Sequence, residues 1–310
     1  MESKIINPLV DVSKKDLTRD NDSSVLDYVA LLKPRVMALA VFTSICGLYL
    51  APGSIHPFLA FTAIVCISVG AGASGAINMW YDKDIDTVMK RTKNRPLPTG
   101  KIHPKDALGY GVILAIGSVL MLGLFLNYFA AMLLAFSISF YVFIYTMWLK
   151  RTTHHNTVIG GAAGAFPPVI GWACVTGDIS AYPLILFLIV FVWTPPHFWA
   201  LALYKDVEYS KVNIPMLPVI KGKYVTKCQI LIYSFILAIA SLAPYYFNFT
   251  GIFYLSLSAV INIIFLYFAF KVFFSNKLTI DKRASNLFRF SILYLYLLFM
   301  GCVFDKLIGI

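Results

Sequence analysis

Nine long apolar runs restrict the folds that are open to this chain. They lie at about residues 35–52, 57–78, 107–125, 128–147, 157–175, 181–203, 226–246, 251–272 and 287–304. Each run approaches or exceeds the ~20 residues that an α-helix needs to cross a bilayer. The runs are apolar on every face, whereas the strands of a membrane barrel alternate apolar and polar residues. The sequence therefore predicts an all-α membrane protein with nine transmembrane helices.

Composition and segment order agree with this assignment. Hydrophobic residues make up 59% of the chain and charged residues 13%, whereas soluble domains average about 25% charged residues. The first apolar run begins too far from the N-terminus, and is followed by too many others, to be a cleaved signal peptide. We therefore expect residues 1–30 to form a loosely ordered cytoplasmic tail and residues 31–310 to form one transmembrane domain.

Basic residues are distributed unevenly between the two sides of the predicted bundle. Of the 26 Lys and Arg residues, all except Lys306 lie in the N-terminal tail, in every second loop, or at the ends of runs beside those loops. The positive-inside rule places these loops in the cytoplasm, with the N-terminus inside and the C-terminus outside. Topology then accounts for most of the net charge of +11 without a nucleic-acid partner. Several Asp residues in the tail argue against a mitochondrial presequence and favour a bacterial inner membrane.

A segment in which acidic residues are followed by basic residues comes directly after the second run. Asn78, Asp82 and Asp86 are spaced four residues apart, so on a helix they share one face. Crowded carboxylates suit Mg²⁺, which proteins hold with one or two carboxylates together with substrate phosphates. Three basic residues that could hold those phosphates follow: Arg91, Lys93 and Arg95. The segment predicts a site for a metal ion and a diphosphate at the end of a membrane helix.

A second acidic loop follows the sixth run, four runs after the first loop and on the same side. It contains Asp206 and Glu208, with Lys205 and Lys211 beside them. A duplicated four-helix unit plus one extra helix would explain this spacing, and duplicated halves commonly enclose a substrate site at their interface. We expect the two acidic clusters to face one another across a central cavity and to hold two or more metal ions. The alternative is an ordinary hydrophilic loop.

Three further residues are candidates for binding. Arg35 opens the first run and could grip phosphate oxygens, or it could simply extend to the membrane interface. His155 precedes the fifth run, and His197 lies within the sixth run behind two prolines. A histidine can ligate iron or transfer protons, although a structural role is equally open for both. Aromatic residues near the same helix ends could stabilise a carbocation or anchor the interface.

These segments resemble the UbiA-type membrane prenyltransferase superfamily, and within it the branch that acts on haem. The superfamily's first signature, Asn-x-x-x-Asp-x-x-x-Asp, is matched by Asn78, Asp82 and Asp86. The other matching segments are LLKPRVM (31–37), NTVIGGAAGAFPPVIGW (156–172), TPPHFWALAL (194–203) and NIPMLPVIKG (213–222). The second signature, two Asp residues four apart, is not kept, because Ser210 stands four residues after Asp206. The haem branch keeps an acidic residue before Tyr, which favours Glu208 over Asp206.

The resemblance implies farnesyl diphosphate and haem B as substrates and Mg²⁺ as the cofactor. It implies transfer of the farnesyl group to the 2-vinyl group of haem with addition of water. The product would serve haem-copper oxidases, so the next haem-modifying enzyme and oxidase assembly factors are expected partners. The implied catalytic residues are Asn78, Asp82, Asp86, Arg91, Lys93 and Arg95. The implied metal ligands are Asn78, Asp82, Asp86, Asp206 and Glu208, and the implied substrate-binding residues are Arg35, Lys205, His197 and His155.

Three other functions remain open to the sequence. A prenyltransferase for an aromatic quinone precursor would share the diphosphate site and differ in its acceptor pocket. A transporter would carry ionisable groups near the middle of the membrane, whereas this chain keeps nearly all its charges in loops or at helix ends. A non-catalytic haem-handling protein would depend on His155 and His197 more than on the Asp residues.

Overall fold

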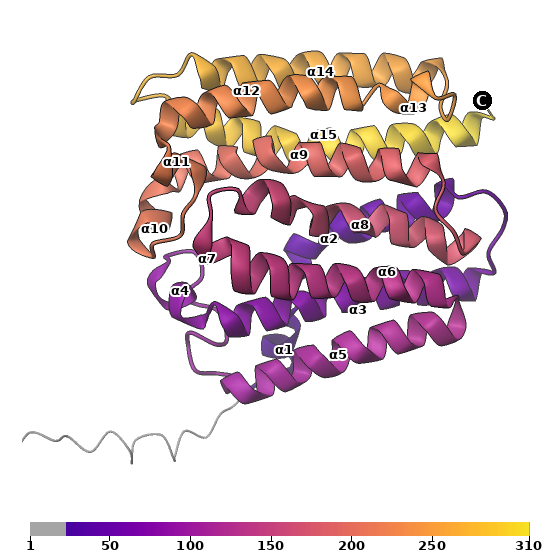
Figure 1. Ribbon diagram of the computed structural model, residues 1–310, viewed down its shortest axis with the longest axis horizontal. Coiled ribbons are helices and arrows are strands. Elements are labelled where there is room, and N and C mark those ends of the chain that lie inside the picture. The colour runs from indigo at the N-terminus through magenta and orange to yellow at the C-terminus, as the bar shows by residue number, and fades with distance from the viewer. Residues whose placement is uncertain (1–22, 310) are drawn as a thin grey trace, which may run out of the picture.

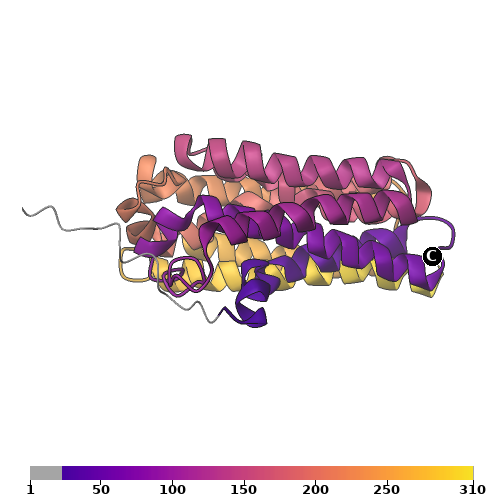
Figure 2. The same ribbon diagram turned by 90° about the horizontal axis from the view of Figure 1, so that it is seen from below.

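The computed structural model describes residues 23–309, and its regular elements within that range are all helices. Eight helices are long and apolar enough to cross a membrane, and the bent pair α1 (Val25–Leu31) and α2 (Pro34–Leu50) provides a ninth span. The long helices run along one common direction (Figures 1 and 2). The protein is therefore a multi-pass membrane protein, and the prediction of an all-α fold with nine spans is confirmed.

The remaining spans follow in order along the chain. They are α3 (Pro57–Tyr81), α5 (Pro104–Phe125), α6 (Tyr128–Ser139) with its continuation η1 (Phe140–Leu149) and α7 (Lys150–Thr152), α8 (Asn156–Thr176), α9 (Ala181–Tyr204), α12 (Gly222–Ala240) with α13 (Ala243–Tyr246), α14 (Ile252–Phe273) and α15 (Ile280–Ile308). The segment η1 is a π-helix, a form that is rare and frequently found at functional sites.

A bend of 58° separates α1 from α2. It falls at Lys33, whose φ of 52° lies in the left-handed region, because Pro34 disfavours helical geometry in the residue before it. The bend directs the Lys33 side chain inward to α3, where Nζ lies 2.6 Å from Asn78 Oδ1. Helix α1 itself begins at a capping box formed by Ser24 and Asp27. Part of the segment expected to be a loose tail is therefore helical, and residues 1–22 lie outside the described range.

The order of elements repeats after four spans. The short helix α4 (Lys83–Val88) follows the second span, and α10 (Asp206–Lys211) and α11 (Leu217–Ile220) follow the sixth. These short helices lie at the same end of the molecule (Figure 1). A buried apolar cluster joins the two segments, with Ile85, Met89, Ala202, Tyr209, Ile214 and Met216 as its core. The two acidic segments therefore meet, as the predicted duplication requires.

Glycines allow α2 and α8 to approach each other closely. A Cβ atom at Gly47 would lie 2.0 Å from the Pro168 carbonyl oxygen, and one at Gly171 would lie 2.1 Å from the Ser44 carbonyl oxygen. Small residues permit such backbone contact between membrane helices. Helix α15 packs on α2, α9 and α14, so the last span joins the two groups of four. Together these contacts enclose space between the spans for a ligand.

Candidate active site

A cavity of about 330 Å³ lies between the two groups of spans. Its polar residues are Lys33, Asn78, Asp82, Asp86, Arg91, Arg95 and Lys150, and its larger apolar and aromatic residues include Met37, Tyr141, Tyr145, Trp193, Phe198 and Leu295. The charged residues come from the helix ends near α4, and the apolar residues from the interiors of the spans. The cavity is therefore amphipathic, with one end suited to an anion and the remainder suited to apolar groups.

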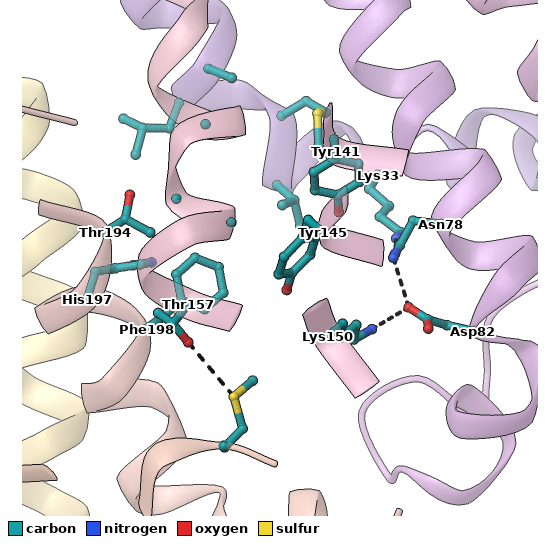
Figure 3. Close-up of a pocket in the computed structure, with 18 of the residues that line it drawn as sticks. Lys33, Asn78, Asp82, Tyr141, Tyr145, Lys150, Thr157, Thr194, His197 and Phe198 are labelled. Carbon is teal, nitrogen blue, oxygen red and sulfur yellow. Dashed lines mark hydrogen bonds and ion pairs between the residues drawn. The ribbon is translucent and has the colours of Figure 1, made fainter. Parts of the chain in front are cut away.

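Asn78 orients the first carboxylate of the polar end. Its Nδ2 donates to Asp82 Oδ2 at 2.8 Å and to Thr146 Oγ1 at 3.1 Å, while its Oδ1 accepts from Lys33. Figure 3 shows the side chains of Lys33, Asn78 and Asp82 converging, while Thr146 belongs to η1. Because every polar atom of this amide has a partner, Asn78 fixes the orientation of Asp82. The role of Thr146 was not found from the sequence, where its only signal is a hydroxyl within an apolar run.

Both carboxylates of the first signature are buried beside cations. Asp82 is 1% exposed and Asp86 is 4% exposed. Lys150 Nζ pairs with Asp82 Oδ2, and Arg95 Nη1 lies 2.7 Å from Asp86 Oδ2. A buried charge is costly unless it is paired, so these cations offset the cost of burying the two carboxylates. Nothing in the local sequence of Lys150 indicates which helix it will contact.

The acidic residues also leave oxygen atoms free for a metal ion. Within the described part of the chain, Asp82 Oδ1 is buried without a hydrogen-bond partner, and Arg151 Nη2 lies 3.6 Å from it. Glu208 pairs through Oε1 with Lys205 at 2.9 Å, and its Oε2 is also buried without a partner. A buried carboxylate oxygen that accepts no hydrogen bond is costly, and a divalent cation would relieve that cost. Oxygen donors of this kind fit Mg²⁺.

The protein supplies only part of a coordination shell. Among residues 23–309, no three His, Cys, Asp or Glu side chains converge closely enough to hold a metal ion by themselves. Mg²⁺ usually keeps several waters and takes further oxygens from substrate phosphates. The site therefore fits a metal ion that arrives with, or is completed by, a diphosphate.

The structure separates the other candidate residues into two groups. Arg91 and Arg95 line the cavity. The candidates that lie outside its lining are Arg35, Lys93, His155, Lys205, Asp206 and Glu208. Asp206 pairs with Lys223 at 2.9 Å. Arg35, Lys93 and His155 are exposed. In place of Arg35, Lys33 reaches the polar end of the cavity, where it donates to Asn78 Oδ1, because the backbone bend turns it inward.

His197 lies in the apolar part of the cavity. Its ring stacks between Trp193 and Phe288, with centroid distances of 4.2 and 4.6 Å. Its Nδ1 lies 2.6 Å from Ser291 Oγ, and that hydroxyl donates to the Phe288 carbonyl oxygen. The Ser291 oxygen must therefore accept from Nδ1–H, which leaves Nε2 with a free lone pair. A neutral histidine in this tautomer can ligate iron or accept a proton.

Two tyrosines of η1 stand between the charged end and His197. Figure 3 shows Tyr141 and Tyr145 with Asn78, Asp82 and Lys150 on one side and His197 and Phe198 on the other. Tyr145 fits against α8 because position 160 is glycine, where a Cβ atom would lie 2.2 Å from the ring. The π faces of these rings would stabilise positive charge that develops between the two ends of the cavity.

Two ionisable residues outside the spans, Asp84 and Tyr209, have shifted pKa values. Arg151 donates to both oxygens of Asp84 at 2.8 Å, and this hydrogen bonding lowers the pKa of Asp84. The pair connects α4 to α7, and Asp84 does not line the cavity. Burial raises the pKa of Tyr209, so this lining residue remains a neutral phenol at physiological pH.

Comparison with known proteins identifies relatives over most of the chain. The model of the UbiA prenyltransferase family matches residues 40–293. A protein from Parvibaculum lavamentivorans is 52% identical over 288 residues, covering 93% of this chain and 91% of the relative. One from Rhizobium meliloti is 52% identical over 301 residues, covering 96% and 95%. Both relatives are named protoheme IX farnesyltransferase.

Solved structures agree on the fold. A structure of digeranylgeranylglyceryl phosphate synthase has a TM-score of 0.74 at 21% identity and covers 90% of this chain and 97% of its own. A UbiA homologue from Archaeoglobus fulgidus bound to DMAPP and Mg²⁺ has a TM-score of 0.66 at 15% identity, covering 88% and 99%. At these identities the likeness establishes the shared architecture of the spans.

Proposed function

Because this chain belongs to the UbiA prenyltransferase family, we propose that it transfers a farnesyl group from farnesyl diphosphate to the 2-vinyl group of haem B. The observation that carries the proposal is the amphipathic cavity, which combines buried carboxylates and arginines at one end with aromatic walls and His197 at the other. The names of relatives that share about half of its residues support the choice of substrates.

The charged end of the cavity would bind the diphosphate. Mg²⁺ held by Asp82 and Asp86, with Glu208 nearby, would supply positive charge that neutralises the leaving group. Asn78 would keep Asp82 in the orientation that binding requires. Arg91 and Arg95 would bind phosphate oxygens and take up negative charge as the carbon–oxygen bond breaks, which is stabilisation aimed at the developing charge.

Two lysines beside the carboxylates would also serve the substrate. Lys33 and Lys150 line the same end of the cavity, and each has a flexible side chain whose ammonium group can reorient toward a phosphate. In this proposal they take the substrate-binding roles that the resemblance gave to Arg35 and Lys205. The two lysines would hold the departing diphosphate after the bond has broken.

The apolar walls would protect the allylic cation that remains. Exclusion of bulk water prevents premature capture of a reactive cation, and the rings of Tyr141 and Tyr145 would stabilise it. The haem 2-vinyl group would attack the cation and form the new carbon–carbon bond. A water molecule would then add to the cation on the porphyrin side and release a proton, which leaves a hydroxyethylfarnesyl substituent. His197 Nε2 is the group that would bind the haem iron.

The topology fits this use of the cavity. The positive-inside rule would place the diphosphate end at the cytoplasmic side of a bacterial inner membrane, with the N-terminus inside. Farnesyl diphosphate would then enter from the cytoplasm, while haem and the farnesyl chain occupy the interior between the spans. The product would supply haem-copper oxidases.

The direct test is conversion of haem by the purified protein. We expect incubation with haem B, farnesyl diphosphate and Mg²⁺ to yield haem that carries farnesyl plus one water by mass, and excess EDTA to stop the reaction. A parallel incubation with 4-hydroxybenzoate as the acceptor tests the quinone-precursor alternative. Undiminished product in EDTA would contradict the metal assignment, and prenylated 4-hydroxybenzoate without modified haem would contradict the choice of acceptor.

A further inference from the structure

A second, narrower cavity of about 100 Å³ adjoins the active-site cavity. Both linings include Met37, Ala40, Tyr141 and Gly164, so the cavities meet where α2, η1 and α8 come together. The second cavity continues from this junction between α3, α6 and α8. No step of the proposed reaction uses this second cavity.

The far end of the second cavity is closed by the protein core. Ile67, Leu134 and Ile170 line it there, and each is 1–2% exposed. All three belong to one packed cluster of buried residues. Native interiors leave few voids larger than a water molecule, so a space that adjoins the active site and ends at buried core residues is suited to part of a substrate.

The lining of the second cavity calls for an apolar occupant. Apart from Tyr141 at the junction, its polar side chains are Ser74 and Ser137. Ser74 Oγ donates to the Gly70 carbonyl oxygen at 3.0 Å, and Ser137 Oγ donates to the Ala163 carbonyl oxygen at 3.4 Å. Among residues 23–309, no charged residue lines the space. A polar ligand would find few partners there and would lose its own hydrogen bonds to water.

The position of the second cavity along α3 matches a chain that starts at the carboxylates. Ser74 and Ile67 lie on the same helix as Asp82, ~12 Å and ~22 Å from it at the helical rise of 1.5 Å per residue. A diphosphate bound at Asp82 would therefore leave its extended prenyl chain running toward these residues. The small volume of about 100 Å³ excludes a planar macrocycle, which would remain in the larger cavity beside His197.

Gly164 stands at the junction as an open position. It is exposed although it lies in the middle of a largely buried helix, and a Cβ atom added there would meet no atom within 4 Å. Two other glycines of α8 also line the larger cavity, and neighbouring side chains already occupy the space beside both of them. A Cβ at Gly160 would lie 2.2 Å from the Tyr145 ring, and one at Gly161 would lie 3.0 Å from Thr194. A side chain at 164 would project only into the passage.

We propose that the second cavity receives the isoprene units farthest from the diphosphate, and that Gly164 keeps the passage to it open. The inference rests on the proposed function, because that function places the diphosphate at Asp82. Gly164 is then a specificity-determining residue. The closed end at Ile67 and Ile170 sets the longest prenyl chain that fits.

The test varies the donor length while the acceptor stays constant. The variant Gly164→Leu, with Gly164→Val as a smaller obstruction, is assayed with haem B and with geranyl, farnesyl and geranylgeranyl diphosphates. The control is Gly117→Leu on α5, where an added Cβ also meets nothing within 4 Å and which lines neither cavity. We expect Gly164→Leu to lower kcat/KM for farnesyl relative to geranyl diphosphate by at least ~10-fold, the discrimination typical of one blocked methylene. The control should keep the wild-type ratio.

Two results would overturn the inference. An equal loss for all three donors would mean that position 164 affects the acceptor or the fold, and an unchanged ratio would mean that the chain lies elsewhere. If the wild-type protein prenylates nothing, the proposed function fails, and displacement of radiolabelled farnesyl diphosphate decides the inference separately. Farnesyl diphosphate should then displace the label better than geranyl diphosphate from wild type and lose that advantage in Gly164→Leu, whereas equal displacement from wild type refutes the inference.

Discussion

The two acidic segments of this protein occupy equivalent places in the chain and have different surroundings. Asp82 follows the last residue of α3 and Asp86 lies on α4, and both are almost fully buried and line the cavity. Asp206 and Glu208 lie on α10, pair with lysines near the surface and remain outside the lining. The segments are joined by the cluster around Tyr209 and Ile85. The two segments therefore lie close together but differ in their burial and in their access to the cavity.

The difference follows from the local backbone of each segment, which decides which side chains face the cavity. In the first segment the backbone hydrogen bonds between residues four apart continue from Asn78 through Asp82 to Asp86, so these residues share a face and line the cavity. In the second segment α9 ends at Tyr204, and the following helix presents Tyr209 to the cavity while its carboxylates turn to Lys205 and Lys223. The first segment is thus built to bind charge, and the second has one free oxygen, Glu208 Oε2, to add.

The largest effect should come from the first segment. We expect Asp82→Asn to lower kcat/KM by ~10³-fold, because it removes a charge that would neutralise the leaving group and such electrostatic contributions reach this size. The measurement is haem conversion at saturating Mg²⁺, with the amount of inserted protein matched by gel filtration in detergent. A variant that turns over at the wild-type rate would remove the distinction between the two segments.

A smaller effect should come from the second segment, and it should differ between Glu208 and Asp206. We expect Glu208→Gln to raise the Mg²⁺ concentration needed for half-maximal rate by ~10-fold, the usual scale for a residue that supports metal binding from nearby. Asp206→Asn is the matched control, since it removes only a partly exposed pair with Lys223, which contributes ~0–1 kcal/mol. A larger shift for Asp206→Asn than for Glu208→Gln would reverse this assignment.

The sequence was sufficient for features that depend on local spacing. The nine apolar runs gave the spans, and the four-residue spacing placed Asn78, Asp82 and Asp86 on one face. It was insufficient wherever a side chain finds its partner across the bundle. Lys150, Lys33 and Thr146 reach the first segment from other helices, and the backbone bend at Lys33 decides that this residue, rather than Arg35, points inward.

The smallest effect should come from Asp84, which belongs to the first segment in sequence and resembles the second in its surroundings. Its side chain is 59% exposed and it pairs with Arg151, outside the cavity. We expect Asp84→Asn to turn over haem within ~2-fold of wild type at pH 7, because an exposed pair contributes ~0–1 kcal/mol. A loss comparable to that of Asp82→Asn would show that the acidic run acts as a unit regardless of burial.

The pH dependence of stability gives this last variant a second readout. Arg151 lowers the pKa of Asp84 below its ordinary 3.8, so the folded state binds this proton less readily than the unfolded state. The pair therefore stabilises the fold above that value, and its contribution is lost as the pH falls through the lowered pKa. We expect the difference in thermal midpoint between wild type and Asp84→Asn in detergent to be present at pH 7 and to shrink as the pH falls below 3.8. A difference that grows on acidification would mean that the proton is bound more tightly in the folded state, and would break the link between Asp84 and Arg151.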